Sequence, residues 1–412
     1  MKILVLAWQI PATSRMPGSP RLFNLCRELA RHHQISMLVM EHARERMDAL
    51  LADPDASGVF EAIEVLPEKG PPSWLGRQIH RLLLEPFFST RWTHPAFYRR
   101  VCERTRAKSD SGSGADLIIA DGLEMTQYVQ DAIVPAIAEL HDSLSLLAGR
   151  SANHEARLFS RLRVRADSWS LGRWERALRR RFALVITNSE VDAEHIRRLD
   201  PRCPVKAINN GVDTDYFSPN PSVEPDPHRL VFTGVMGYSP NADAARFLGE
   251  EILPLVQARE PRAEFWVVGH APGPEVQALS NLPGVHVTGS VDDVRVHVLR
   301  SQVFVCPLRF GAGIKNKILA AMAMGRPVVA TPISLHGIDA KPEIEVLIGD
   351  TPEQFAAQIS RLLEDDALAE NIGEAGRRLV LERYSWRGRA EALERELCGV
   401  VSETERLQRS DS

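Results

Sequence analysis

The chain has 412 residues and a formal net charge of −4 at pH 7, and 44% of its residues are hydrophobic and 25% charged. This composition is typical of a globular protein of two or three domains and excludes a disordered or fibrous chain. The slightly acidic balance excludes a dedicated nucleic-acid binder. The sequence contains no stretch of 18 apolar residues, so no membrane-spanning helix is predicted.

The five cysteines are spread along the chain, and no two are spaced for a C-x-x-C zinc or redox motif. An odd, scattered set in a chain of this size is typical of reduced thiols, so we expect a cytoplasmic protein. The apolar run at the N-terminus is too short for the core of a signal peptide and predicts a buried first strand.

The first half of the chain alternates between short apolar runs and segments with helical spacing. A helix is predicted over 19–31, where leucines recur on one face. Short, continuous apolar runs predict buried parallel strands. These runs lie at 2–7, 35–40, 116–120, 183–187 and 206–208. The alternation predicts an α/β fold with a doubly wound sheet.

Four prolines within 219–228 interrupt this pattern and predict a linker, because proline neither continues a helix nor fits a central strand. Beyond it, strands are predicted at 229–234, 264–269, 285–290, 303–308, 327–332 and 345–349. Helices are predicted at 241–258, 293–301, 315–324, 353–363, 366–383 and 386–408. We therefore expect one domain over 1–218, a second over 229–385, and a C-terminal helix over 386–412 that packs back toward the first domain.

The loop between the predicted strand 303–308 and the helix near 315 is the strongest candidate binding site. Two glycines allow a ligand to approach its backbone, and three cations surround it. These residues are Arg309, Gly311, Gly313, Lys315 and Lys317. The N-terminus of the following helix adds free N–H groups and the positive end of a dipole. The pattern favours an anion site suited to a diphosphate, and a plain turn with surface lysines is the alternative.

The stretch 307–332 resembles the C-terminal signature of the GT-B-fold glycosyltransferases of family 4, or glycosyltransferase group 1. It is most similar to the sugar transferases of exopolysaccharide systems. The positions that match the family pattern are Pro307, Leu308, Arg309, Gly311, Gly313, Lys317, Leu319, Ala321, Met322, Ala323, Gly325, Pro327, Val328 and Val329. Two positions depart from it, because the family's paired acidic residues, one of which holds the donor ribose, fall here on Ala320 and Ala312.

Other segments carry the same resemblance. Residues 208–219 resemble the family's segment before the hinge, and residues 231–248 resemble the first strand, loop and helix of its nucleotide domain, with Gly234 at the strand end. Asp213 and Asp215 lie inside the first match and lack a partner carboxylate cluster, so we expect no metal site there.

In the first domain the resemblance points to two places. Relatives have a glycine-rich loop near the acceptor and the donor phosphate, which implies such a role for Gly18 and Arg21, although Gly-Ser-Pro at this point also caps a helix. Relatives often carry a histidine that contacts the donor sugar, which corresponds to His141 at the end of a predicted strand, with Asp142 as its candidate partner. A structural histidine is the alternative.

The resemblance implies a GT-B fold of two Rossmann-like, doubly wound domains that face each other across a cleft. It also implies retaining, metal-independent transfer of a hexose from a nucleotide-diphosphate sugar to a glycan or lipid-linked acceptor, in polysaccharide or glycoconjugate synthesis and with no cofactor. The implied catalytic residues are His141, Arg309 and Lys317. The implied substrate-binding residues are Gly18, Arg21, Gly234, Gly311, Gly313, Lys315 and Ala320.

The distribution of charge suggests a further partner. Residues 1–218 carry a net charge of +3, whereas residues 219–412 carry −7. The stretches 73–106 and 157–181 mix arginine with aromatic residues, as helices at anionic membrane surfaces do. Core aromatics with a solvated arginine face give the same pattern. We expect a cytoplasmic enzyme for which the inner face of the plasma membrane is a candidate surface.

Three alternatives remain open. The first is a GT-B nucleotide-sugar epimerase, which needs no acceptor. The second is a non-catalytic partner with a degenerate donor site, as Ala320 and Ala312 suggest. The third is a membrane-surface interaction protein that binds no nucleotide.

Overall fold

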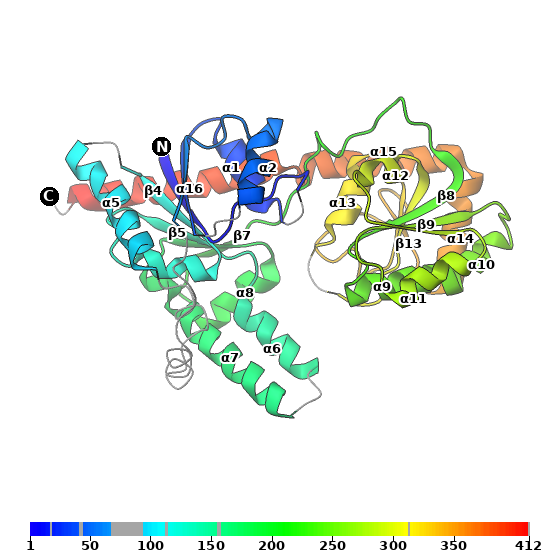
Figure 1. Ribbon diagram of the computed structural model, residues 1–412, viewed down its shortest axis with the longest axis horizontal. Coiled ribbons are helices and arrows are strands. Elements are labelled where there is room, and N and C mark those ends of the chain that lie inside the picture. Colours follow the sequence, from blue (N-terminus) through cyan, green and yellow to red (C-terminus); the bar gives the residue numbers. More distant parts are fainter. Residues whose placement is uncertain are drawn as a thin grey trace. The chain divides into compact units, whose positions relative to one another are not determined.

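The structure is a computed structural model that describes residues 1–16, 19–40, 44–66, 94–111, 114–154, 158–311 and 314–410. The chain folds into two compact units (Figure 1). Unit 1 comprises Met1–Asn209 and Arg389–Ser412, and unit 2 comprises Asn210–Gly388. The predicted linker 219–228 falls within unit 2, and from Asp226 it already belongs to a strand. The domain limits inferred from the sequence stay a prediction.

In the described part of the chain, unit 1 contains a seven-stranded parallel sheet in the order β3-β2-β1-β4-β5-β6-β7. Its strands are β1 (Lys2–Ala7), β2 (Gln34–Val39), β3 (Ala62–Val65), β4 (Leu117–Asp121), β5 (Ala136–Glu139), β6 (Leu184–Thr187) and β7 (Val205–Ala207). Its helices are α1 (Arg21–Leu29), α2 (Arg44–Ala52), α5 (Pro95–Ser111), α6 (Leu144–His154), α7 (Leu158–Ala177) and α8 (Glu190–Leu199). The strand order reverses between β1 and β4, as in a doubly wound fold.

Unit 2 contains, among the described residues, a six-stranded parallel sheet in the order β10-β9-β8-β11-β12-β13. Its strands are β8 (Asp226–Thr233), β9 (Glu264–Val268), β10 (Val285–Gly289), β11 (Ser301–Cys306), β12 (Val328–Ala330) and β13 (Leu347–Ile348). Its helices are α9 (Ser239–Arg246), α10 (Leu253–Gln257), α11 (Pro274–Gln277), α12 (Val294–Leu299), α13 (Asn316–Ala323), α14 (Pro352–Glu364) and α15 (Asp366–Arg383). Here the reversal lies between β8 and β11.

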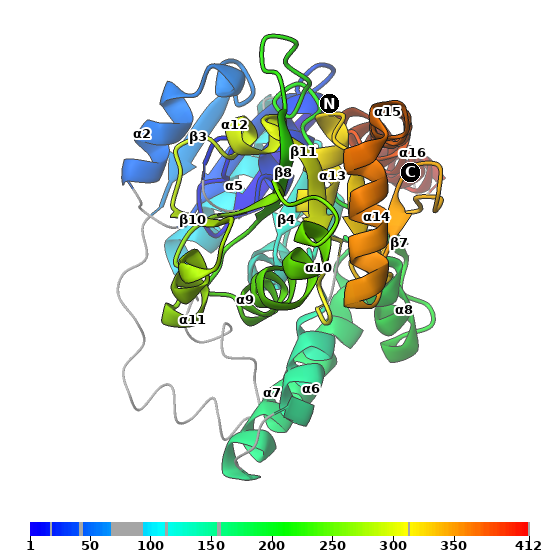
Figure 2. The same ribbon diagram turned by 90° about the vertical axis from the view of Figure 1, so that its right-hand side faces the viewer.

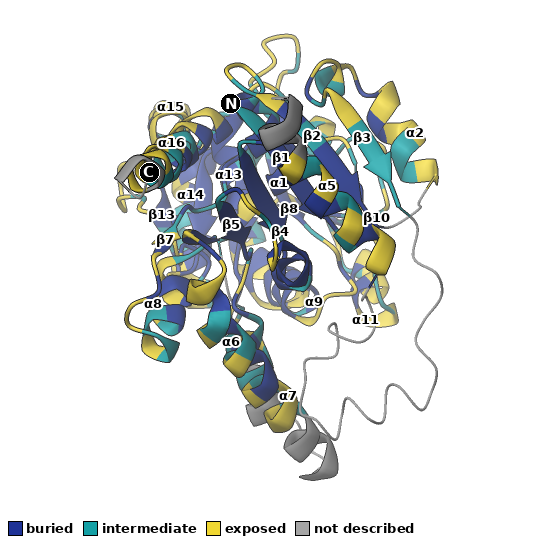
Figure 3. Cartoon of the chain, turned by 90° about the vertical axis from the view of Figure 1, so that its left-hand side faces the viewer, coloured by how far each residue is buried: buried dark blue, intermediate teal, exposed yellow. Residues whose placement is uncertain are grey.

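The predicted α/β, doubly wound fold is confirmed in both units. Strands fully covered by helices read as continuous apolar runs, and Leu4 and Ile118, which are partners on β1 and β4, are each 0% exposed. Figure 3 shows buried residues along the strands and exposed residues on the outer faces of helices. In unit 2, α14 packs against β11, β12 and β13 (Figure 2).

Two features differ in detail from the predicted elements. The predicted helix 241–258 consists of α9, a π-helical turn at Phe247–Ile252, and α10. Pro254 lacks an N–H and disturbs regular α-helical bonding, which accounts for a wider turn just before it. The edge strand β3 was not predicted, since its residues are half-buried or exposed and include Glu64.

The last helix, α16 (Trp386–Ser410), starts in unit 2 and belongs to unit 1 from Arg389 on. Its side of unit 1 is fixed by polar contacts: Glu394 Oε1 lies 3.0 Å from His32 Nδ1 and 2.9 Å from His33 Nε2. Unit 1 is therefore built from two segments that are distant in the sequence. No helix in the ranges described here is long and apolar enough to cross a membrane.

Candidate functional site

The candidate anion site of unit 2 lies where the strand order reverses. β8 and β11 are neighbours in the sheet, and the chain leaves each of them at the same edge because they are parallel. In open α/β sheets, ligands bind at the carboxyl ends of the strands, at such a reversal. Gly234 directly follows β8, and Arg309, Gly311 and Lys315 follow β11.

Lys317 and Gly234 meet at this edge. Lys317, on the first turn of α13, donates from Nζ to Asn241 Oδ1 at 2.7 Å, and its Nζ lies 4.3 Å from the centre of the Phe232 ring. A Cβ atom at Gly234 would lie 2.7 Å from Lys317 Nζ and 2.7 Å from Asn241 Nδ2. A side chain at Gly234 would therefore displace the ammonium group, which explains a glycine at this strand end.

A second glycine supports the same arrangement. Gly269 follows β9 with φ at +149°, and a Cβ atom there would lie 1.8 Å from the carbonyl oxygen of Gly234. No side chain fits at that distance, and the φ value is one that only glycine adopts readily. The two strand ends are thus packed backbone against backbone, beside Lys317.

The ammonium groups of this site are held in an environment that disfavours their charge. Burial, together with the charge of the nearby Lys315, lowers the pKa of Lys317 from 10.5 to about 8. Burial also lowers the pKa of Lys315, which is 9% exposed and precedes the first residue of α13. An anion that binds beside such a buried ammonium group stabilises its charged form. Perturbed pKa values therefore often mark functional sites.

Arg309 has a partner that the sequence did not reveal. Its Nε lies 2.9 Å from Asp243 Oδ2 and its Nη2 lies 2.5 Å from Asp243 Oδ1, a bidentate ion pair with a residue of α9. The hydrogen bond to Asp243 is the main reason why the pKa of Arg309 is raised. The guanidinium stays half-exposed and stacks over Phe247, with 4.7 Å to the ring centre. Asp243 offsets its charge, so Arg309 contributes less positive potential than was expected.

Of the remaining predicted residues of unit 2, the structure describes Gly311 and Ala320. Gly311 has φ at +138°, and a Cβ atom built on it would lie 3.7 Å from Lys315 Cε, so these two residues are neighbours. Ala320 is partly buried against the core of unit 2 and presents no polar group. Gly313 and Ala312 lie outside the described residues, as does Gly18 of unit 1.

In unit 1, His141 lies two residues beyond the end of β5 and faces the end of β4. Its Nε2 is 2.9 Å from Asp121 Oδ1, and its backbone has φ at +37°, in the left-handed region. Burial would lower the pKa of His141, but the charge and hydrogen bond of Asp121, helped by the charge of Glu139, raise it to about 9. The imidazole is therefore protonated at neutral pH. The candidate partner of His141 is thus Asp121, since no contact between His141 and Asp142 appears among the described residues.

Arg21 differs from its predicted place. The residue is 1% exposed, and its Nε donates to Glu139 Oε1 at 2.9 Å, so it forms a buried ion pair at the base of the His141 loop. A buried charge is stable only when it is paired in this way. In the structure Arg21 therefore holds a strand end, and its expected contact with a substrate stays a prediction.

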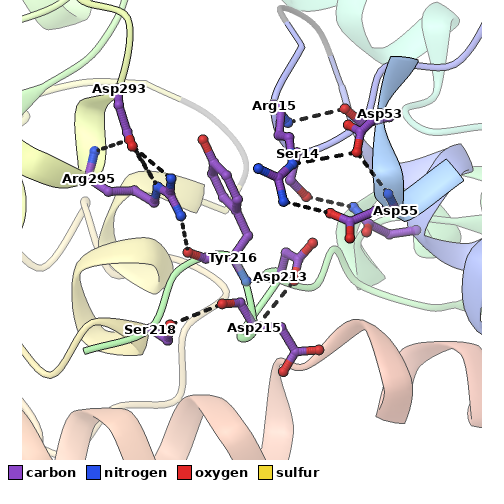
Figure 4. A network of polar contacts seen from close by, with 12 residues as sticks. Ser14, Arg15, Asp53, Asp55, Asp213, Asp215, Tyr216, Ser218, Asp293 and Arg295 are labelled. Carbon is purple, nitrogen blue, oxygen red and sulfur yellow. Dashed lines mark hydrogen bonds and ion pairs between the residues drawn. The ribbon is translucent and has the colours of Figure 1, made fainter. Parts of the chain in front are cut away.

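The acidic residue Asp213, before the predicted linker, closes a turn. Asp213 is 3% exposed and its Oδ1 accepts hydrogen bonds from the N–H groups of Asp215 and Tyr216, at 3.3 and 3.1 Å. Figure 4 shows this turn, with Arg295 stacked on Tyr216. In the part of the chain that the structure describes, no group of three or more His, Cys, Asp or Glu residues is arranged to hold a metal ion.

Three functional candidates were not found from the sequence: Asp121, Asn241 and Asp243. Asp121 directly follows the apolar run 116–120 that was predicted as a strand, and an acidic residue at such a strand end was the available signal. Asn241 and Asp243 lie in a helix whose neighbours at the sheet edge depend on the order of the strands. No local motif marks them.

Known families match both units. The family "Glycosyltransferase Family 4" matches residues 20–216, and "Glycosyl transferases group 1" matches residues 227–365. A curated relative, the GDP-mannose-dependent alpha-(1-6)-phosphatidylinositol monomannoside mannosyltransferase of Mycobacterium tuberculosis, is 26% identical over 279 residues, which is 59% of this chain and 70% of the relative. The Mycolicibacterium smegmatis protein of the same description is 28% identical over 225 residues, or 48% of this chain and 57% of that one.

Solved structures of the same architecture cover nearly the whole chain. Sucrose-phosphate synthase from Thermosynechococcus elongatus superimposes with a TM-score of 0.64 at 18% identity, over 98% of this chain and 100% of that one. HepE from Anabaena, solved in complex with UDP, gives 0.65 at 16% identity, over 97% of this chain and 100% of the other. These likenesses show the fold. Together with the family matches to both units, they establish that the chain is a GT-B-fold glycosyltransferase that belongs to group 1, family 4.

Proposed function

We propose that this glycosyltransferase moves a hexose from a nucleotide-diphosphate sugar to a glycan or lipid-linked acceptor, with retention at the anomeric carbon and without a metal ion. The observation that carries the proposal is the contact of Lys317 with Asn241 beside the side-chain-free edge at Gly234. It combines a cation, a close backbone approach and a helix start at the carboxyl edge of the sheet.

The chemical task at this site is to stabilise the leaving diphosphate. As the bond to the sugar breaks, negative charge develops on the phosphate oxygen that linked the diphosphate to the anomeric carbon. Fixed cations and dipoles lower the energy of that state. Lys317 and Lys315 supply ammonium groups, and α13 supplies free N–H groups at its N-terminus. Binding of the diphosphate would raise the pKa of Lys317 again, because the anion favours the charged form.

His141 is proposed to contact the transferred sugar from unit 1. A protonated imidazole held by Asp121 offers one fixed N–H donor, suited to a sugar hydroxyl or to charge on the departing oxygen. The contact with Asp121 keeps the ring in one orientation. The roles of Arg309 and Gly311 as further contacts of the donor stay proposals of the same kind.

The donor base is open, and the relatives suggest which compounds to test. HepE was solved with UDP and with UDP-glucose, and the mycobacterial relatives are named for GDP-mannose. We expect one nucleotide diphosphate in a panel of UDP, GDP, ADP and their sugars to raise the melting temperature. A ligand at 100 times its dissociation constant adds about 2.7 kcal/mol to the free energy of unfolding. No shift with any compound would refute donor binding.

Turnover separates the transferase from the alternative functions. A transferase releases the nucleoside diphosphate faster when an acceptor is added, whereas an epimerase converts the nucleotide sugar without one. The small side chain of Ala320 favours a weakened donor site as the second candidate. If the donor site is weakened only because Ala320 replaces the family's acidic residue, Ala320→Glu should raise donor affinity, measured by calorimetry. A loss of affinity together with a loss of stability would mean that the pocket cannot accommodate the carboxylate.

We further propose that unit 1 approaches an anionic membrane surface through α7. In the stretch 94–106, Phe97 is fully buried and Arg100 is paired with Glu64, as expected for core and solvated face, and residues 73–93 lie outside the described residues. Helix α7 differs. Its Trp169 is 53% exposed, and the guanidinium of Arg173 lies 5.0 Å from its ring centre.

These two residues belong to a basic surface cavity. Arg165, Trp169, Arg173 and Arg176 follow one another at helical spacing, and together with His195 of α8 they line a cavity of about 360 Å³. Each basic side chain close to an anionic leaflet contributes roughly 1 kcal/mol, and a tryptophan ring is well suited to the headgroup region. A lipid-linked acceptor would then reach the enzyme without leaving the bilayer.

Vesicle co-sedimentation tests this surface with a charge-matched control. The triple variant Arg165→Gln/Arg173→Gln/Arg176→Gln should lose binding to anionic vesicles at low salt. The control variant Arg179→Gln/Arg197→Gln/Arg198→Gln removes the same charge from arginines that are paired with acidic residues of unit 1, and it should bind as the unchanged protein does. Equal loss in both variants would show a net-charge effect without a defined surface.

A further inference from the structure

Glu175 on α7 is a buried carboxylate whose partners all come from the start of α6. It is 1% exposed, and the hydroxyl of Ser143 donates to it, with 3.1 and 3.0 Å to its two oxygens. The N–H of Ser145 donates to Oε1 at 3.2 Å, and the hydroxyl of Ser145 donates to Oε2. Because that hydroxyl has only one proton, His195 Nε2, at 2.8 Å from Ser145 Oγ, must be a donor.

A second buried carboxylate holds the same turn from another helix. Asp192 of α8 accepts the N–H of Ser143 through Oδ1 at 2.9 Å, and the hydroxyl of Ser189 donates to its Oδ2. Ser143 is 0% exposed and also caps α6, because its Oγ accepts the N–H of Leu146 at 3.3 Å. The first turn of α6 is therefore tied to α7 and α8 by separate carboxylates.

This turn begins two residues after His141, whose backbone is strained. A non-glycine residue at a φ of +37° is uncommon, and it persists only where its surroundings fix it. On the strand side, the carbonyl of His141 accepts the N–H of Asn188 at 2.9 Å, and the imidazole meets Asp121. On the helix side, the ties to Glu175 and Asp192 restrain the chain. Among the described residues, no contact joins the ring of His141 to the Glu175 network.

A carboxylate is a costly way to pack one helix against another. Burial raises the pKa of Glu175, and hydrogen bonds from Ser145 and Ser143 offset this only in part. Apolar side chains of similar volume usually pack helices at least as well as a buried charge does. What a carboxylate adds is directional acceptance of several hydrogen bonds at once, which fixes the position of the helix start.

We propose that Glu175 is a positioning residue: by fixing the first turn of α6, it holds His141 in its left-handed backbone conformation with the imidazole on Asp121. The expected effect of Glu175 on turnover rests on the role proposed above for His141, whereas its effect on the position of His141 does not. The position of His141 itself can be measured without substrate.

The test is Glu175→Gln, which keeps the size of the side chain but replaces one acceptor oxygen with a donor group. The imidazole of His141 is followed by NMR during a pH titration, and His141→Gln identifies its resonance among the 13 histidines. In the unchanged protein its pKa is expected at about 9. In Glu175→Gln it should fall toward the ordinary value of 6.5, because the ring no longer stays on Asp121.

Activity provides a second, separable measurement. Glu175→Gln should lower kcat on the order of 10- to 100-fold, since a displacement of about 1 Å in a reacting geometry costs that much. The dissociation constant of the nucleoside diphosphate should not change, because its proposed contacts are in unit 2. If the titration shifts and kcat does not, the positioning by Glu175 stands and the role proposed for His141 is refuted.

Asp116→Asn is the matched control. The carboxylate of Asp116 also accepts a backbone N–H, that of Lys2 at 2.8 Å, but it lies at the amino-terminal ends of the strands of the same sheet. This variant should leave the titration of His141 unchanged. Ser145→Ala serves as a second variant should Glu175→Gln not fold, and it should give a smaller shift in the same direction. A folded Glu175→Gln protein in which His141 still titrates near 9 would overturn the proposal.

Discussion

Replacing Lys317 with methionine should weaken donor binding while leaving the fold as stable as before or more stable. The substitution keeps an unbranched chain of similar length and removes the ammonium group. Burial lowers the pKa of Lys317 from 10.5 in the unfolded chain to about 8 in the folded one. The folded protein therefore holds this charge at a cost, and a residue kept at a cost to stability is typical of a binding site.

The size of the two effects follows from the structure. A pKa that is lowered by about 2.5 units corresponds to a cost on the order of 3 kcal/mol at neutral pH. This is an upper limit for the stabilisation, because Asn241 loses its donor, which costs about 1–3 kcal/mol. The loss of one charge-assisted contact to the diphosphate should weaken binding by about 1.5–3 kcal/mol, or roughly 10- to 150-fold.

The dependence on pH gives the sign of the effect. Between the folded value near 8 and the unfolded value of 10.5, the unfolded chain binds more protons at Lys317 than the folded chain does. The stability of the unchanged protein relative to Lys317→Met should therefore rise with pH through this window. Chemical denaturation at several pH values measures this, calorimetry measures the affinity, and Lys341→Met, at an exposed lysine of unit 2, is the control.

Two results would refute this reasoning. If Lys317→Met binds the nucleoside diphosphate as tightly as the unchanged protein, the ammonium group does not contact it. If the variant is destabilised at pH 7 by more than the loss at Asn241 explains, Lys317 has a structural role, and the lowered pKa says nothing about a ligand.

Three further predictions concern single residues of the two units. Gly234→Ala should fold, since the atoms nearest to its Cβ belong to the side chains of Lys317 and Asn241 and not to the backbone, but it should displace Lys317 and weaken nucleotide binding in calorimetry at least as much as Lys317→Met; unchanged affinity would contradict the close approach. Asp121→Asn should lower the pKa of His141 well below 9, as followed by NMR, because the opposing charge is gone; an unaltered titration would show that another group sets it. Arg309→Ala should weaken binding less than Lys317→Met, because its guanidinium already has a carboxylate partner; a larger loss would mean that this partner releases it when the donor binds.

The sequence predicted the doubly wound fold because its evidence is local. A buried parallel strand is a continuous apolar run, and the runs at β1, β4, β8 and β11 can each be recognised without knowing their neighbours. The glycine and lysine pattern near α13 is local in the same sense. Half-buried edge strands such as β3 carry no such run and could not be predicted.

The polar partners of the site residues were out of reach for the opposite reason. Asp243 pairs with Arg309 across 66 positions, and Glu139 pairs with Arg21 across 118 positions. Such pairs depend on strand order, which periodicity does not reveal. Arg21 illustrates the consequence: its place in the first turn after a glycine loop gives no sign of a buried carboxylate partner 118 positions away.

The division of unit 1 into two separate segments has a consequence for synthesis. Unit 2 occupies one continuous stretch, Asn210–Gly388, whereas unit 1 needs residues from Arg389 on as well as the first 209. Domains fold as they leave the ribosome, from the N-terminus onward. Unit 1 therefore cannot be completed until α16 has been synthesised, because His32 and His33 lack their contact with Glu394 until then. Unit 2 can already be complete at that stage. The nascent N-terminal segment is thus the natural client of a chaperone, and a chain that stops before Arg389 should contain a folded unit 2 and an unfinished unit 1.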